Sequence, residues 1–116
     1  MPRYLISFPS DAMSHVQAEE LSAVGEAAHA VVQEAMDAGV WVFGGGIAEN
    51  VPPVRVAGDG TVSPGTYPQT SEFDGGFAVL DLPSRDAALE WAAKMAAACR
   101  CAQEVREFMP DPAVGN

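Results

Sequence analysis

Hydrophobic and polar residues follow two different periods along the chain, and each change of period marks an element that we expect. Arg3 to Phe8 alternates between apolar and polar positions, which is typical of a strand with one buried face. From about Gln17 to Ala38 the apolar positions recur every three or four residues, which predicts an amphipathic helix that Gly39 ends. Val40 to Phe43 then predicts a second strand, closed by three consecutive glycines.

A tight hairpin is expected in the middle of the chain. Gly58-Asp59-Gly60 lies between two short strand-like runs, Val54 to Ala57 and Thr61 to Ser63. Gly and Asp suit the positive φ angles that such a turn requires, so the two runs are expected to pair with each other. A polar loop, Ser63 to Asp74, follows the hairpin.

The last part of the chain predicts a strand, a helix and a strand. Phe77 to Leu82 is entered through a Gly-Gly turn, Ser84 is placed to cap a helix that runs to about Ala98, and Gln103 to Met109 alternates again. The order is β-α-β, hairpin, β-α-β, which predicts an α+β fold of the ferredoxin-like type, an antiparallel sheet with two helices on one face. We expect one domain over residues 1–110 and a C-terminal tail over residues 111–116.

The expected strands carry apolar side chains on both faces, whereas the two helices can cover only one of them. An uncovered apolar face of this size is normally buried against a partner. We therefore expect a homodimer in which the two sheets face each other and enclose a barrel-like interior.

The composition of the chain argues against two classes of binding partner, nucleic acids and membranes. Six basic residues stand against sixteen acidic ones, a formal net charge of −10, and such a chain repels nucleic acid. The N-terminal residues do not have the pattern of a signal peptide, and no apolar run approaches the roughly 20 residues of a membrane helix. We expect a cytoplasmic protein without nucleic-acid or membrane partners, in which Cys99 and Cys101 are free thiols.

Several stretches resemble one known family. They are DAGVWVFGGGIAEN (Asp37 to Asn50), the hairpin VRVAGDGTVS, DAALEWAAK (Asp86 to Lys94) and VREFMP (Val105 to Pro110). Together they resemble the YCII-related family, in particular its DGPF-domain branch, within the dimeric α+β barrel superfamily. The Asp-Gly-Pro-Phe motif of that branch corresponds here to Pro64-Gly65-Thr66-Tyr67, so Pro64 stands in place of the motif Asp.

The resemblance implies a dimer formed sheet to sheet, and it leaves the biochemical role open. One subfamily carries a His and an Asp that face a cleft, which implies possible enzymatic activity. Some DGPF proteins are associated with alternative sigma factors, which implies a regulatory link. Neither implication names a substrate.

Two groups of residues are candidates for a catalytic or ligand-binding role. His29 lies beside the apolar stripe of the first helix, in the region where the YCII subfamily has its His, and could act as a general acid-base with a carboxylate such as Asp81. A half-exposed His without a catalytic role is the alternative. In the polar loop, Tyr67, Thr70 and Glu72 could bind a ligand, or the loop could cross to a partner subunit.

Other common sites are not expected. Gly44-Gly45-Gly46 lacks the helix and the Lys-Ser or Lys-Thr of a phosphate-binding loop, so we interpret it as a bulge or a close strand approach. Cys99 and Cys101 lack the further ligands of a zinc site, and we expect neither metal nor cofactor. Taken with the uncovered sheet face and the family resemblance, these observations predict a homodimer that binds a small molecule or serves as an interaction module. The alternatives are a cofactor-free enzyme that uses His29 and a regulatory protein linked to a sigma factor.

Overall fold

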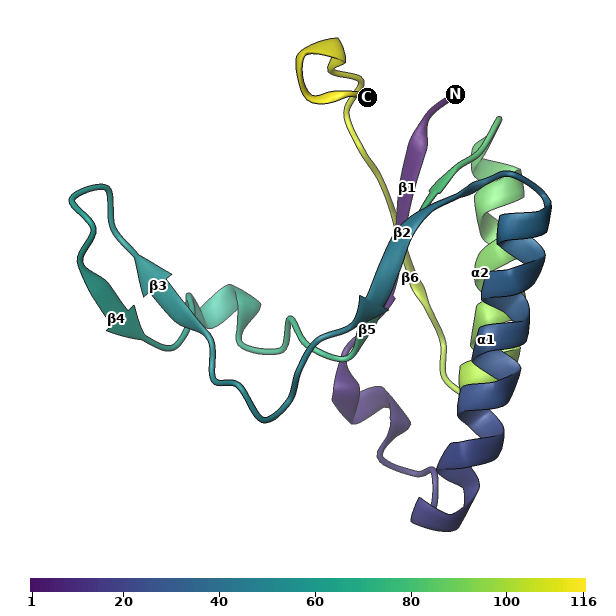
Figure 1. Cartoon of the computed structure of the whole chain (residues 1–116), viewed down its shortest axis with the longest axis horizontal. Helices are drawn as coiled ribbons and strands as arrows, with labels where there is room; N and C mark the ends of the chain where they lie inside the picture. Colours follow the sequence, from purple (N-terminus) through teal and green to yellow (C-terminus); the bar gives the residue numbers. More distant parts are fainter.

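Two helices cover one face of a four-stranded antiparallel sheet in the computed structural model, which describes residues 1–116 (Figure 1). The sheet has the order β2-β5-β1-β6, and a separate two-stranded hairpin joins β3 to β4. The elements are β1 (Arg3–Phe8), α1 (Leu21–Asp37), β2 (Trp41–Gly46), β3 (Val54–Val56), β4 (Val62–Pro64), β5 (Gly76–Asp81), α2 (Arg85–Cys99) and β6 (Glu104–Glu107). The predicted ferredoxin-like α+β fold is confirmed.

The main local difference from the sequence prediction is the length of β2. The strand was expected to end at Phe43, but it continues through the glycines to Gly46 because they pair with the first three residues of β5, Gly76 to Ala78. Gly44 lies so close to β5 that a Cβ atom there would stand 2.6 Å from the carbonyl oxygen of Phe77. The register of β2 also shifts between Trp41 and Phe43. Of the bulge or close strand approach that we inferred for the glycines, the close approach is therefore present at Gly44, whereas the register shift lies before the glycines.

The helices begin and end close to the predicted positions, for identifiable reasons. α1 begins at Leu21 rather than near Gln17, because a short 3-10 turn over Ala18–Glu20 precedes it. The hydroxyl oxygen of Ser84 accepts a hydrogen bond from the backbone N–H of Ala87 at 3.2 Å, which caps α2 as expected.

The core lies between the helices and the inner face of the sheet. Alternation along β1 and β5 points Tyr4, Ile6 and Leu80 toward the helices, where they are almost completely buried. Small residues of α2 let this helix approach the sheet closely. The core consists of Tyr4, Ile6, Ala35, Ala78, Leu80, Leu82, Ala88, Ala92 and Met95.

The other face of the sheet carries no helix, and we call it the open face. Leu5, Val79 and Phe77 alternate with core residues and therefore lie on it, and Phe43 pairs with Val79 from the neighbouring strand. The side chain of Phe43 is 61% exposed, although its ring lies 6.0 Å from that of Phe77. A single chain thus leaves this apolar face uncovered.

The β3–β4 hairpin projects on the side of the sheet opposite to the helices (Figure 1). We call residues 47–67 the arm. The arm makes the chain broad, with extents of 43 × 43 × 20 Å. None of the helices combines the length and the apolarity needed to cross a membrane.

Candidate functional site

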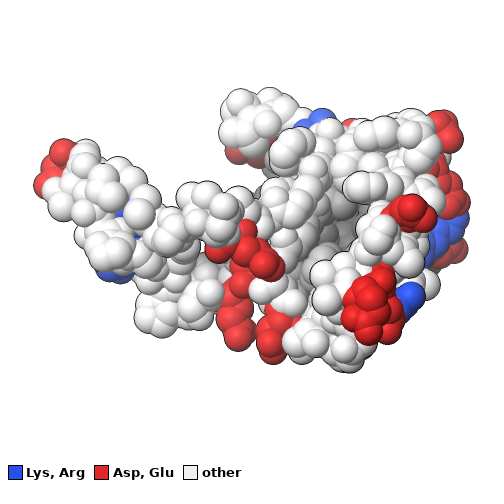
Figure 2. Space-filling view, turned by 60° about the horizontal axis from the view of Figure 1, so that its bottom comes forward, with Lys and Arg blue, Asp and Glu red and all other residues white.

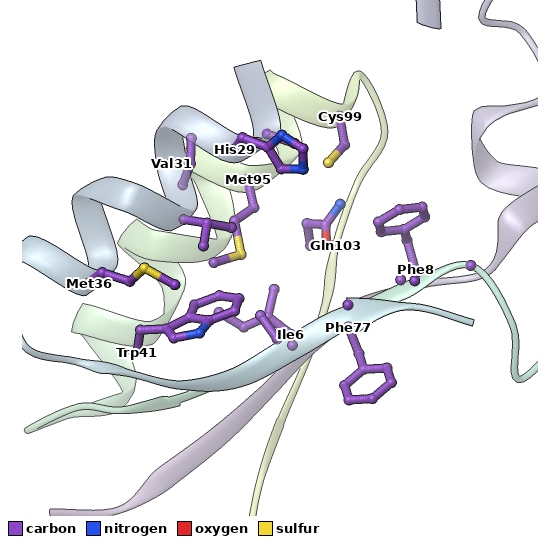
Figure 3. A pocket seen from close by; sticks show the side chains of 18 residues that line it. Ile6, Phe8, His29, Val31, Met36, Trp41, Phe77, Met95, Cys99 and Gln103 are labelled. Carbon is purple, nitrogen blue, oxygen red and sulfur yellow. The ribbon is translucent and has the colours of Figure 1, made fainter. Parts of the chain in front are cut away.

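A cavity of about 470 Å³ opens between the two helices and the inner face of the sheet, and we call it the helix-side cavity (Figure 3). Side chains of α1 form one wall, the end of α2 and Gln103, just before β6, form another, and β1, β2 and β5 form the floor. Its lining is Ile6, Phe8, Ala28, His29, Val31, Val32, Met36, Trp41, Gly44, Gly45, Gly46, Gly75, Gly76, Phe77, Ala78, Met95, Cys99 and Gln103.

The walls of this cavity carry no Asp, Glu, Lys or Arg. Apart from the indole nitrogen of Trp41, polar side-chain atoms come from His29, Cys99 and Gln103, which gather at one end of the cavity (Figure 3). The opposite end is formed by Trp41, Met36 and aliphatic side chains. The cavity therefore offers an apolar body and one hydrogen-bonding end, the usual organisation of a small-molecule site.

Glycines form one margin of the helix-side cavity. Gly44 to Gly46 on β2 lie next to Gly75 and Gly76 at the start of β5, and none of these residues brings a side chain. Gly75 has φ +75°, a left-handed conformation that side chains rarely adopt. The space that larger residues would fill at this margin therefore remains open.

The structure places His29 in the cavity but does not bring Asp81 to it. Asp81 lies on the open face, since its neighbour Leu80 points into the core, and its carboxylate accepts a hydrogen bond from Nε of Arg3 at 2.8 Å. His29 belongs to α1, and its side chain therefore lies on the other side of the sheet, the side that the helices cover. The expected pairing of His29 with Asp81 is therefore wrong within one chain, because strand alternation points the carboxylate away from the helices.

The two cysteines are free, and neither is activated. Burial raises the pKa of the Cys99 thiol, and the neighbouring Cys101 raises it further. Burial also raises the pKa of Cys101. Both thiols are therefore neutral near pH 7 and lack the thiolate that a nucleophile requires. No three His, Cys, Asp or Glu residues lie close enough together to hold a metal ion.

A second cavity, of about 410 Å³, lies on the open face beneath the polar loop. Thr70 and Glu72 line it together with Glu104 and Arg106, so two of the three predicted loop residues meet here rather than at His29. Tyr67 does not line either cavity. Tyr67 is 66% exposed, and the guanidinium of Arg55 lies over its ring, 5.6 Å from the ring centroid.

Asp74 fastens the polar loop to the end of β1. The backbone N–H and the hydroxyl of Ser10 donate hydrogen bonds, each of 2.9 Å, to the two carboxylate oxygens of Asp74. The bond from the Ser10 backbone N–H, followed by the bond from its hydroxyl, lowers the pKa of Asp74 below the ordinary value. Because the charged form is bound more strongly in the folded chain, ionised Asp74 stabilises the fold.

In acid, the free energy of unfolding of the variant Asp74→Asn is expected to depend less on pH than that of the wild type. The contribution of Asp74 is complete above the ordinary aspartate pKa of about 4 and is lost as the pH falls through its lower folded-state pKa. Urea unfolding of both proteins from pH 6 to pH 2 would measure this difference. Parallel wild-type and variant profiles below pH 4 would contradict this role of Asp74.

Sequence reasoning singled out His29, which lines the cavity but is exposed, and its chemical role stays a prediction; the neighbours of His29 were not identified. Met95 and Cys99 are four residues apart on α2 and so share one face, which was a usable signal. Gln103 follows the helix and enters the cavity only through the path of the connecting turn. The glycines of β2 were a second signal, since a strand without side chains leaves volume beside it.

The sequence model described as the YCII-related domain matches residues 4–110, which spans both helices and every strand of the structure. A search of curated proteins gave no match.

Proposed function

Because the chain belongs to the YCII-related family, we propose that it is a homodimeric small-molecule-binding protein whose ligand occupies the helix-side cavity. The observation that carries this proposal is the cavity of about 470 Å³, whose lining contains no Asp, Glu, Lys or Arg. This volume lies within the range of roughly 300–1,000 Å³ that small-molecule sites occupy.

The lining defines the chemical class of the ligand. A charged group would lose its hydration in this cavity without finding a Lys, Arg, Asp or Glu in the lining. Trp41, Met36 and Met95 instead favour a flat or aromatic apolar body, because sulfur and indole groups make favourable contacts with rings. His29 and Gln103 could hydrogen-bond one polar end. The expected ligand is therefore an uncharged, largely apolar molecule with one hydrogen-bonding group.

Filling the cavity is expected to abolish most of this binding. Ala28 lies on α1 and lines the cavity, so the variant Ala28→Phe places an aromatic ring in the space that the ligand needs. Binding of the uncharged probe N-phenyl-1-naphthylamine, followed by its fluorescence, should weaken by about tenfold or more, which corresponds to at least about 1.4 kcal/mol.

Ala27 provides the matched control. It precedes Ala28 on the same helix but is exposed and does not line the cavity. The variant Ala27→Phe makes the same chemical change and should bind the probe as the wild type does. If folded Ala28→Phe protein, checked by circular dichroism, retains wild-type affinity, the helix-side cavity is not the binding site.

The dimer is the second part of the proposal. Its support is the open face, where Phe43 and Val79 present apolar side chains that no helix of the same chain covers. A cytoplasmic location and membership of the DGPF branch also belong to the proposal. The two free thiols fit a reducing compartment. The branch motif continues as Ala-Glu-Thr-Lys-Glu, which corresponds to residues 68–72, and the residues of this chain that fit the motif are Gly65, the aromatic Tyr67, Thr70 and Glu72.

Enzymatic activity is the alternative function, and the position of His29 in the cavity favours it. A general acid-base His needs a group that fixes its tautomer. No carboxylate of the same chain lines the cavity, so that group would be Gln103, a backbone carbonyl or the substrate itself. The absence of an orienting carboxylate makes binding the better supported of the two functions.

A further inference from the structure

The arm, residues 47–67, extends away from the rest of its own chain. Residues 47–62 are all exposed, although β3 and β4 pair as a regular hairpin. Most of the arm consists of uncharged residues, with Glu49, Arg55 and Asp59 as the exceptions (Figure 2). An isolated two-stranded hairpin is at best marginally stable in water, so an arm of this kind is stabilised by packing on something else.

The two faces of the arm differ in character. Val54 pairs with Pro64, and Val56 pairs with Val62, so these four residues share one face of the hairpin. Arg55 pairs with Ser63 and lies on the other face, where its guanidinium covers the ring of Tyr67. The apolar face has no such cover: the side chains of Val54, Val56 and Val62 are 56%, 65% and 60% exposed. We call these three residues the valine face.

The position of the arm indicates what covers the valine face. The arm leaves the sheet after β2 and projects on the same side as the open face, so the two surfaces meet at an angle (Figure 1). A body seated on the open face lies alongside the arm. In a two-fold pair each copy supplies both an open face and an arm, so a second copy satisfies both uncovered surfaces at once.

We propose that the arm of each copy clasps the flank of a second copy of this chain and buries its valine face there. This inference rests on the dimer part of the proposed function and adds a contact that sheet-to-sheet packing alone does not require. The open face and the arm together offer a surface comparable with the roughly 20–30 residues per partner of a stable interface. The scarcity of charged residues on the arm fits the charge depletion of interface centres.

A charge placed on either face of the arm tests the inference. The variant Val62→Glu puts a carboxylate on the valine face, and the dimer dissociation constant should rise by about tenfold or more, since each dimer would bury two unpaired charges. Ser63→Glu is the matched control, because it adds the same charge to the next residue, on the other face and opposite Arg55. Sedimentation velocity over a concentration series measures both constants.

Hydrogen exchange in the wild-type protein gives a second readout that needs no variant. Backbone amides of β3 and β4 should exchange more slowly at concentrations where the dimer forms than at concentrations where it dissociates. A wild-type dimer that Val62→Glu leaves unchanged, with arm amides insensitive to concentration, would overturn the clasp and leave the dimer standing. A wild-type chain that stays monomeric at high micromolar concentration would overturn the dimer and the clasp together, and the binding of the probe in the helix-side cavity would remain a separate result.

Discussion

The variant Gly75→Ala is expected to lower the midpoint of thermal unfolding by roughly 12–20 °C, equivalent to about 3–5 kcal/mol for a domain of this size. Two effects add. Gly75 has φ +75°, where a side chain costs about 1–2 kcal/mol. A Cβ atom would also collide with the carbonyl oxygen of Phe8 and stand 2.7 Å from the backbone nitrogen of Ser10. These are backbone atoms, so relief requires movement of the chain and strains the nearby hydrogen bonds from Ser10 to Asp74.

Gly39 separates the two effects. It has φ +76°, almost the same value, but no atom lies within 4 Å of the position that a Cβ would occupy. The variant Gly39→Ala should therefore cost only the conformational strain, about 1–2 kcal/mol. Differential scanning calorimetry of both variants measures the difference. Equal losses at the two positions would show that crowding around Gly75 contributes nothing.

The variant Phe43→Asp is expected to dissociate the proposed dimer. The ring is 61% exposed in one chain, so most of its burial would come from the partner. Burying such a side chain contributes about 1.5–3 kcal/mol, and a symmetric dimer buries two of them. Their replacement by aspartate should weaken association by about 10²- to 10⁴-fold, with further loss from burying a charged group.

Light scattering at matched concentrations measures this effect, and Leu89→Asp is its control. Leu89 is also exposed, at 43%, but lies on α2, on the side of the molecule away from the open face. That variant should keep the wild-type mass. A Phe43→Asp protein that remains dimeric would show that the two sheets do not meet at the open face.

The fold was predictable because its local signals agree with one another. Alternation in β1, the 3.6-residue period of α1 and the Ser84 cap each define an element without help from distant residues. The end of β2 was not predictable in the same way. Glycine weakens a strand locally, and only pairing with β5, which needs the close approach at Gly44, continues β2 through Gly46.

The candidate site was less predictable, since a cavity depends on what neighbouring elements leave unfilled. His29 could be singled out as a polar residue beside an apolar stripe. Its distance from Asp81 depends on which face of β5 meets the helices. The alternation of Asp81 with Leu80 contains that information, but only after the core face of the strand is known. The convergence of Cys99 and Gln103 on the same cavity depends on the turn between α2 and β6.

The two outer strands of the main sheet differ in their capacity to accept another strand. β6, with the sequence EVRE, presents charged side chains at one margin, whereas β2, with the sequence WVFGGG, presents none at the other. Charged margins hinder the addition of a foreign β-segment, and uncharged ones do not. Addition of a strand is thus hindered along β6 and less hindered along β2, so that edge-to-edge pairing between copies of this chain would end with two β2 strands side by side.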